Sequence, residues 1–169
     1  MLLNPDRYFA HKKDWFVLSV FAGSFLVLKI TLIGILALAG KFVDLSDIIA
    51  PELDKSGQFD DDNDVFYGIV IAPILETFIF QYLIIKGLLY VQIVKRDPAI
   101  AILAATIVFS LAHADPSTVV FAGVVLAYNF YFFNKKRSGS FAYWSTVLLH
   151  SFYNLVTYLL AYKYISVWL

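Results

Sequence analysis

The strongest constraint on this chain is a series of five long apolar runs, separated by short polar segments. The runs are Trp15–Ala39, Val65–Ile85, Ala99–Ala114, Ser117–Phe133 and Phe141–Tyr162. A helix needs about 20 apolar residues to cross the ~30 Å hydrocarbon core of a bilayer, and the first, second and fifth runs reach that length. The pattern predicts an all-α, polytopic integral membrane helical bundle with about five transmembrane helices.

The third and fourth runs are shorter, and only Asp115 and Pro116 separate them. This spacing predicts a tight helical hairpin, with a re-entrant pair as the alternative. The first run is too long for a cleavable signal peptide, and no small-residue cleavage pattern follows it. The charged fraction of 15% is low for a soluble protein, which usually has about 25%.

Basic residues alternate between the connecting segments. They cluster before the first run, between the second and third, and between the fourth and fifth, whereas residues 40–64 are mainly acidic. The positive-inside rule then predicts an N-terminus in the cytoplasm and a C-terminus outside. The predicted organisation is a cytoplasmic segment at 1–14, a first span at 15–39, an acidic extracytoplasmic loop at 40–64, a four-helix core at 65–162 and a tail at 163–169.

Composition excludes several classes of function. Thirteen basic and thirteen acidic residues cancel, so no global field attracts nucleic acid. The absence of cysteine excludes disulfides, thiolate metal sites and cysteine nucleophiles. The acidic run "DDDND" at 60–64 lacks the glycine and the distant glutamate of an EF-hand. We therefore interpret it as part of a solvated outer loop.

Four ionisable residues interrupt the apolar runs: Lys29, Glu76, His113 and His150, with Lys86 at a membrane edge. Charged groups at bilayer depth are costly, and they usually face the protein interior and mark function. The chain has only two glutamates and three histidines. One glutamate and two histidines therefore lie in apolar runs, where a charged side chain costs the most free energy.

Helix geometry tests whether these residues can meet. At about 1.5 Å rise per residue, Glu76 and His150 fall in the same layer of the bilayer. His113 and Asn154 lie within about two helical turns of that layer, and Asn154 shares a helix face with His150. Each residue alone could simply bond a neighbouring helix. Together they fit activation of a water by a carboxylate, or metal binding by glutamate and imidazoles.

Three short motifs resemble those of one known family. The chain has "ETFIFQ" at 76–81, "FSLAH" at 109–113 and "HSFYN" at 150–154. It resembles the CPBP family of CAAX proteases and bacteriocin-processing enzymes, also called Abi, whose motifs are E-E-x-x-x-R, F-x-x-x-H and H-x-x-x-N/D. The order and spacing match from Ala72 to Tyr162. Other intramembrane hydrolase patterns are absent, because there is no H-E-x-x-H motif and no aspartate in the middle of a run.

The resemblance implies a role for each site residue. Glu76 would activate water, His113 would bind or orient that water or a metal, and His150 and Asn154 would stabilise the oxyanion. The resemblance does not determine the cofactor. If a divalent metal such as zinc is used, Glu76, His113 and His150 are its predicted ligands. It also implies a multi-pass protein of a bacterial cytoplasmic membrane.

Two positions depart from the family pattern. Thr77 stands where the family has its second glutamate, and Gln81 stands where it has arginine. Two hypotheses follow. The first is an intramembrane endopeptidase that cleaves a hydrophobic or lipid-anchored peptide. The second is a catalytically silent relative that acts as a membrane-embedded binding, immunity or regulatory protein. A channel or transporter is less favoured, since no inverted repeat is visible. The expected partners are the bilayer and a membrane-anchored peptide or protein, and the sequence does not indicate an oligomeric state.

Overall fold

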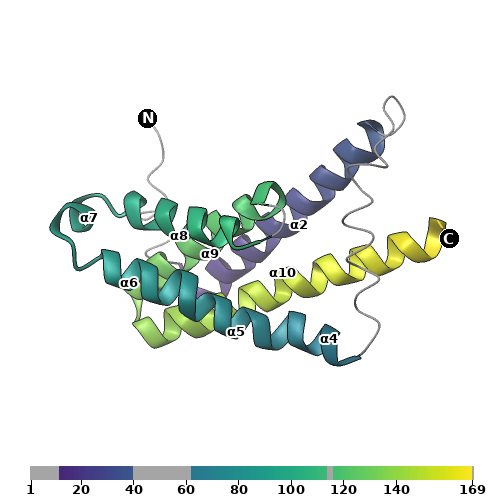
Figure 1. The fold of residues 1–169 in the computed structure, drawn as a ribbon. Helices are drawn as coiled ribbons and strands as arrows, with labels where there is room; N and C mark the ends of the chain where they lie inside the picture. The colour runs from purple at the N-terminus through teal and green to yellow at the C-terminus, as the bar shows by residue number, and fades with distance from the viewer. Residues whose placement is uncertain (1–11, 40–61, 114–115, 169) are drawn as a thin grey trace.

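The computed structural model describes residues 12–39, 62–113 and 116–168, and all regular secondary structure in these ranges is helical (Figure 1). Most of the predicted acidic loop, residues 40–61, lies outside the described residues, as does the side chain of Lys29. The elements are α2 (Asp14–Ala39), α4 (Asp62–Phe66), η1 (Tyr67–Ile71), α5 (Ala72–Glu76), η2 (Thr77–Leu83), α6 (Ile84–Leu88), α7 (Gln92–Arg96), α8 (Ala99–Leu111), α9 (Pro116–Lys136) and α10 (Gly139–Trp168).

Elements α4 to α6 form one continuous helix over residues 62–88, in which η1 and η2 are π-helical. The backbone at the junctions Phe66, Ile71 and Glu76 stays in the right-handed helical region, so the helix widens locally without breaking. The π-helical hydrogen bond joins residues five apart, and such widened turns are frequent at functional sites.

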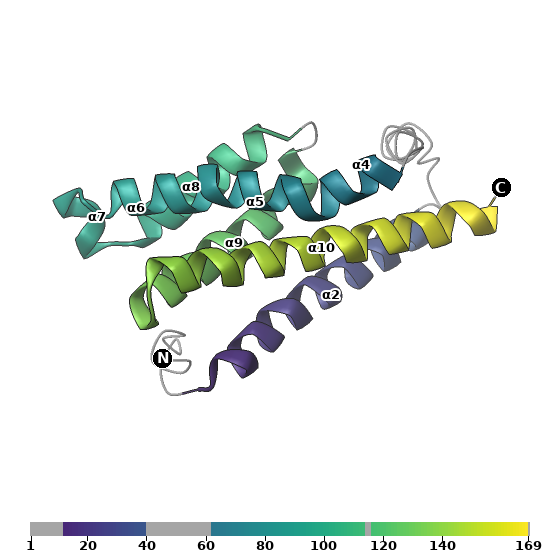
Figure 2. The same cartoon turned by 90° about the horizontal axis from the view of Figure 1, so that it is seen from below.

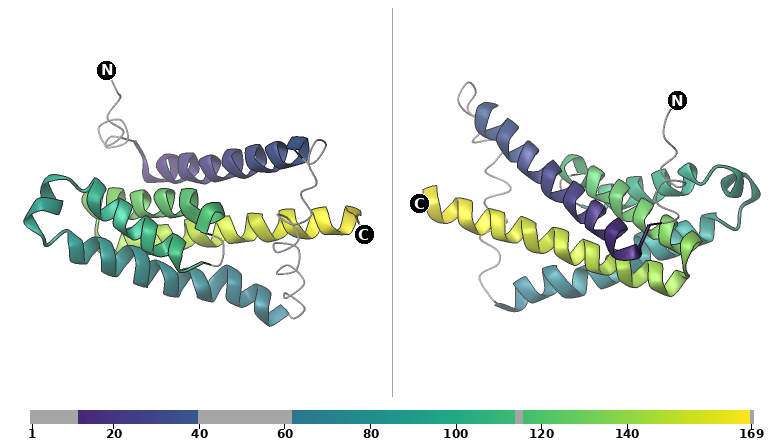
Figure 3. Two further views of the ribbon diagram at one scale, coloured as in Figure 1. Left: turned by 45° about the horizontal axis from the view of Figure 1, so that its top comes forward. Right: turned by 180° about the vertical axis from the view of Figure 1, so that it is seen from behind.

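Helix α10 lies between two neighbours along most of its length. Figure 2 shows the 62–88 helix on one side of α10 and α2 on the other, and both pairs are in contact. Helix α9 packs against both α8 and α10, and Figure 3 shows the same arrangement from two further sides. Gly123 permits the close approach of α9 to α8, because an added Cβ would lie 3.1 Å from the Phe109 ring and 3.2 Å from the Thr106 methyl.

Helix α2 joins the bundle through three apolar side chains spaced four residues apart: Val17, Phe21 and Phe25. The ring of Phe21 meets Tyr128 edge to face at 5.8 Å, and Phe25 lies 5.0 Å from Tyr153. The opposite face of α2, including Trp15 and Val27, is exposed. One apolar stripe therefore attaches this helix to α9 and α10.

The basic side chains gather at one end of the bundle. The ends of α6 and α9 and the starts of α2 and α10 meet there (Figure 2). Eight lysine and arginine side chains lie in this region: Lys12, Lys13, Lys86, Lys95, Arg96, Lys135, Lys136 and Arg137. The side chains of Lys29 and Lys163 lie outside the described part. Asp14 lies among the eight basic side chains. Arg137 Nε donates to Asp14 Oδ2 at 2.8 Å, and Lys136 Nζ is 3.0 Å from Oδ1.

The observed helices can be compared with the predicted runs. All five runs are helical over most of their length. Helix α8 ends at Leu111, so His113 follows the helix, and α10 continues to Trp168 through most of the predicted tail. In the described part, one helix, Asp64–Leu88, is long and apolar enough to cross a membrane, while Asp14–Val27 and Ala99–Leu111 are shorter apolar helices.

The first prediction concerns the Asp14 cluster. Burial alone would raise the pKa of Asp14, but hydrogen bonds and charge from Lys136 and Arg137 outweigh it and lower the pKa. Because the folded pKa is the lower one, the stabilisation is complete above the unfolded pKa of about 3.9 and disappears as pH falls through the folded pKa. We expect Asp14→Asn to lower stability by at most ~1 kcal/mol at pH 7, since water screens the pairs.

Thermal unfolding in detergent at several pH values measures this difference. The gap between wild type and Asp14→Asn should close as pH falls below about 4. Asp64→Asn is the control, because Asp64 forms no ion pair with any described residue, and it should match wild type. A gap for Asp14→Asn that stays constant down to the lowest pH would contradict the linkage.

Candidate active site

Glu76 is the last residue of α5, immediately before the second π-helical segment. Its Oε2 atom lies 3.5 Å from His113 Nε2 and 3.6 Å from His150 Nε2. The side chains of Glu76 and His113 are 27% and 28% exposed, whereas that of His150 is 2% exposed. The structure thus brings together one carboxylate and two imidazoles from three separate parts of the chain, and the Glu76–His113 side of the cluster is accessible.

His113 is oriented by the helix that precedes it. Its Nδ1 atom is 2.7 Å from the Phe109 carbonyl oxygen. Since a carbonyl can only accept, Nδ1 carries a hydrogen and donates it. Nε2 then faces Glu76, at a distance slightly beyond the usual range of about 2.7–3.2 Å. A favourable contact between Nε2 and Oε2 requires a hydrogen on one of these two atoms.

Phe109 packs against both histidines. Its ring centroid is 4.4 Å from that of His113 and 5.6 Å from that of His150, the latter in an edge-to-face arrangement. Phe109 is itself buried. It therefore fixes both imidazoles at once, through its ring and its carbonyl group. Phe109 begins the motif "FSLAH", and its position four residues before His113 is the sequence signal from which this role could have been predicted.

Asn154 lies one turn beyond His150 on α10, and its side chain binds the backbone. Asn154 Nδ2 donates to the Gly68 carbonyl at 2.8 Å. Gly68 is about 12 Å along the helix from Glu76, and no contact of Asn154 with Glu76 or the histidines is present among the described residues. The structure therefore does not bring Asn154 into the carboxylate–imidazole cluster.

The Gly68 carbonyl needs this side chain because of Pro73. In η1 the Ala72 N–H donates to the Tyr67 carbonyl, five residues back. The next donor in that pattern would be the nitrogen of Pro73, which has no hydrogen. Gly68 therefore has no helical donor for its carbonyl, and Asn154 supplies one. The Tyr143 hydroxyl, which is also on α10, donates to the Ile74 carbonyl at 3.0 Å. Helix α10 therefore holds the 62–88 helix at two backbone positions.

Thr77 and Gln81 are both fully buried. Together with Pro73 and Ile85 they form a buried stripe at four-residue spacing, which favours a helix that turns more slowly than an α-helix. The Thr77 hydroxyl and both polar atoms of the Gln81 amide have no hydrogen-bond partner in the described structure. In the described part of the chain, no lysine or arginine pairs with Glu76, whose ionic contacts are the two histidines.

The predicted metal ligands can be tested against this geometry. Across residues 12–39, 62–113 and 116–168, no group of three His, Cys, Asp or Glu side chains is arranged to hold a metal ion. The donors of Glu76, His113 and His150 contact one another in pairs, and His150 Nδ1 has no partner. A metal cofactor therefore stays a prediction, with these three residues as the predicted ligands.

A carboxylate on an apolar helix thus meets two histidines from other parts of the chain. Residues 64–156 match the family of type II CAAX prenyl endopeptidases, Rce1-like. The match spans more than half of the chain and includes Glu76, His113, His150 and Asn154. The chain belongs to this family of membrane-embedded CAAX proteases. No curated protein and no solved structure matches it.

The second prediction concerns the link between Asn154 and Pro73. We expect Asn154→Ala to cost roughly 0.5–1.5 kcal/mol, because it removes one hydrogen bond to a part-buried carbonyl. In a Pro73→Ala background residue 73 gains an N–H that can donate to Gly68, so the same change should cost less. Thermal unfolding of wild type, the two single variants and the double variant in one detergent measures the coupling free energy between residues 73 and 154. We expect it to be at least ~0.5 kcal/mol.

Thr157→Ala is the matched control for this cycle, since the Thr157 hydroxyl bonds only the Tyr153 carbonyl of its own helix. Its cost should be the same in the wild-type background and in the Pro73→Ala background. Equal costs of Asn154→Ala in the two backgrounds would show that Pro73 is not the reason why Gly68 needs Asn154.

Proposed function

We propose that this chain is an intramembrane endopeptidase that hydrolyses a peptide bond in a hydrophobic or lipid-anchored peptide, with Glu76 as the general base. The observation that carries the proposal is the contact of the Glu76 carboxylate with both His113 and His150, within 3.6 Å. Family membership supports the reaction class. The partial exposure of Glu76 and His113 supports access for water and substrate.

In the proposed reaction, a water beside Glu76 and His113 gives one proton to the Glu76 carboxylate as its oxygen bonds the substrate carbonyl carbon. The peptide C–N bond then breaks, and the departing nitrogen takes the proton from Glu76. His113, oriented by the Phe109 carbonyl, holds the attacking water. The overall reaction consumes one water and forms one new carboxyl end and one new amino end.

His150 and Asn154 are proposed to stabilise the oxyanion, as the family resemblance implies. The burial of His150 and its contact with Glu76 also support a positioning role, in which its imidazole fixes the carboxylate. Asn154 keeps a second amide hydrogen beyond the one donated to Gly68. A metal such as zinc, if one is used, would be held by Glu76, His113 and His150.

We further propose five membrane spans, with the N-terminus in the cytoplasm of a bacterial-type cell and the C-terminus outside. The collection of eight basic side chains at one end of the bundle supports this orientation. The exposed aromatic side chains Trp15, Tyr90 and Trp144 at the same end support a membrane–water boundary there.

The third prediction tests this topology. Single cysteines at Ser56, which lies outside the described residues, and at Ser138, in the turn before α10, are treated with a membrane-impermeant thiol reagent in intact cells. We expect labelling at residue 56 only. After the membrane is permeabilised, both sites should react, which controls for local accessibility. Labelling of residue 138 in intact cells would contradict the orientation.

A catalytically silent relative is the second candidate. It is favoured by the side chains present at positions 77 and 81, Thr77 and Gln81. These neutral side chains replace the family's glutamate and arginine, and their buried polar atoms have no partner in the described structure. Glu76 therefore lacks the nearby arginine that would stabilise its ionised form. In this alternative, the chain binds a membrane protein or peptide without cleaving it.

The fourth prediction separates the two candidates. Glu76→Gln retains shape and hydrogen bonding but cannot take a proton, so turnover should fall at least ~10²-fold. Folding should survive, because a neutral amide costs no more in an apolar site than an ion. Cleavage of a hydrophobic peptide library in liposomes, followed by mass spectrometry, is the measurement. Asp64→Asn, an exposed change on the same helix, is the control and should cleave like wild type.

Restoring the family pattern with Thr77→Glu plus Gln81→Arg should keep or raise this activity. Each single change buries an unpaired charge and should lower stability more than the double change does. If wild type cleaves nothing and the restored variant does, the silent alternative is correct. If Glu76→Gln cleaves as fast as wild type, the proposed base is wrong. Loss of activity with a chelator and its return with zinc would assign a metal.

A further inference from the structure

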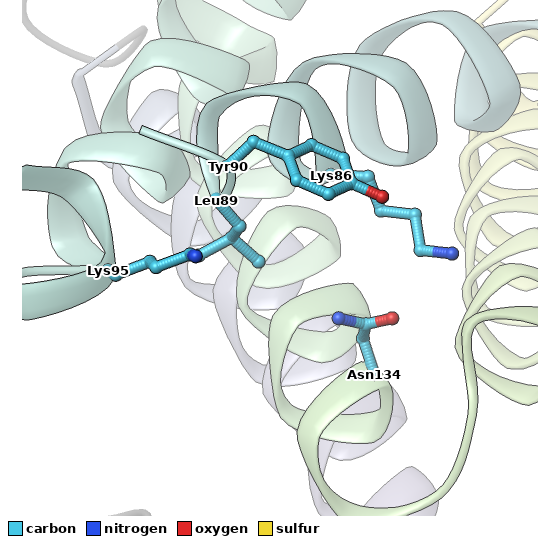
Figure 4. A pocket seen from close by; sticks show the side chains of 5 residues that line it. All are labelled: Lys86, Leu89, Tyr90, Lys95 and Asn134. Carbon is cyan, nitrogen blue, oxygen red and sulfur yellow. The ribbon is translucent and has the colours of Figure 1, made fainter. Parts of the chain in front are cut away.

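A pocket lies at the basic end of the bundle, away from the Glu76 cluster. Its volume is about 190 Å³, and its lining residues are Lys86, Leu89, Tyr90, Lys95 and Asn134 (Figure 4). They come from α6 and the turn after it, from α7 and from α9. Lys86 is ten residues after Glu76, or about 15 Å along the same helix. The pocket is therefore distinct from the proposed catalytic site.

The ammonium group of Lys86 is held at this pocket without a counter-ion. Lys86 Nζ lies 3.5 Å from the Tyr82 hydroxyl and 4.8 Å from the centre of its ring. No described carboxylate lies within ion-pair distance of it. Gly139 leaves room for this ammonium, because an added Cβ would be 2.7 Å from Nζ. A half-buried cation in this state favours the binding of an anion.

The surroundings of the pocket are positive. Eight lysine and arginine side chains lie at this end, while Asp14 and Asp97 are the acidic side chains of the described part found here. Asp14 already pairs with Lys136 and Arg137. Asp97 Oδ1 accepts the Ala99 N–H. The local field therefore attracts anions.

The pocket also lies at the end of the helix that could cross a membrane. Lys86 is in the last turn of Asp64–Leu88, the described helix that is long and apolar enough to cross a bilayer. Tyr90, in the pocket, is exposed, as are Trp15 and Trp144 at the same end, and such aromatic residues mark the head-group level. Basic pockets between helices at this level bind the head groups of anionic lipids.

We propose that this pocket binds the phosphate group of an anionic membrane lipid. Lys86 and Lys95 contact the phosphate oxygens, Asn134 and Tyr90 supply hydrogen-bond donors, and Leu89 contacts the apolar part of the lipid. The shared chemistry is a phosphate, whether from a lipid or from solution. The inference does not depend on proteolysis, so its failure and the failure of the proposed function are separate results.

The fifth prediction measures lipid affinity on the full chain in a nonionic detergent. Native mass spectrometry gives dissociation constants for short-chain phosphatidylglycerol and for phosphatidylcholine with the same chains. We expect the anionic lipid to bind at least about tenfold more tightly, and Lys86→Gln plus Lys95→Gln to abolish that preference. The control is Lys13→Gln plus Arg96→Gln, which removes the same charge from exposed residues outside the pocket. The affinity of this control for phosphatidylglycerol should fall less than about threefold.

Gly139→Ala is a second variant, with no change in charge. Its Cβ would displace the Lys86 ammonium, and it should weaken phosphatidylglycerol binding several-fold while melting like wild type. Millimolar inorganic phosphate that displaces the lipid would support the phosphate chemistry and add a soluble source. Equal losses in the two double variants, no preference for the anionic lipid, or displacement by a peptide carboxylate but not by phosphate would each overturn the proposal.

Discussion

The contact of one carboxylate with two imidazoles is the interaction on which the rest of this structure depends. Glu76 lies in the described helix that is long and apolar enough to cross a membrane, where an unpaired charge is costly. His113 and His150 come from opposite sides of α9 in the sequence, so α8 and α10 must both reach the same level of the 62–88 helix. The packing of α9 between α8 and α10, with Gly123 at its closest approach, makes this meeting possible.

The supports around this contact are mainly backbone groups. The Phe109 carbonyl fixes His113, and the carbonyls of Gly68 and Ile74 are held by Asn154 and Tyr143 of α10. In an apolar environment, a backbone group that loses its helical partner must find another. Pro73 and the π-helical segment create that need at Gly68. The irregular part of the 62–88 helix is therefore also held to α10 by two side-chain hydrogen bonds to its backbone.

Much of this arrangement could be predicted from the sequence. The apolar runs located the helices, and the depths of Glu76, His113 and His150 predicted their shared level, because helical rise is regular. The π-helical segments, the end of α8 before His113 and the bond from Asn154 to Gly68 could not be predicted. They depend on which backbone donor pairs with which acceptor, and hydrophobic periodicity carries no signal for that. The pocket at Lys86 combines residues up to 48 positions apart in the chain, so no local pattern indicated it.

The π-helical segment η2 has a consequence for the register of the whole 62–88 helix. It separates Glu76 from Lys86, and it accommodates more residues than the same number of α-turns. Deleting one residue while restoring α-helical winding would keep the angular position of Lys86 relative to Glu76, whereas winding the same residues as an α-helix would rotate everything after them by about 100° relative to Glu76. Lys86 would then leave the groove beside Gly139 and Asn134 while Glu76 kept its histidines. The widened segment thus sets the direction in which Lys86 points around the helix axis relative to Glu76.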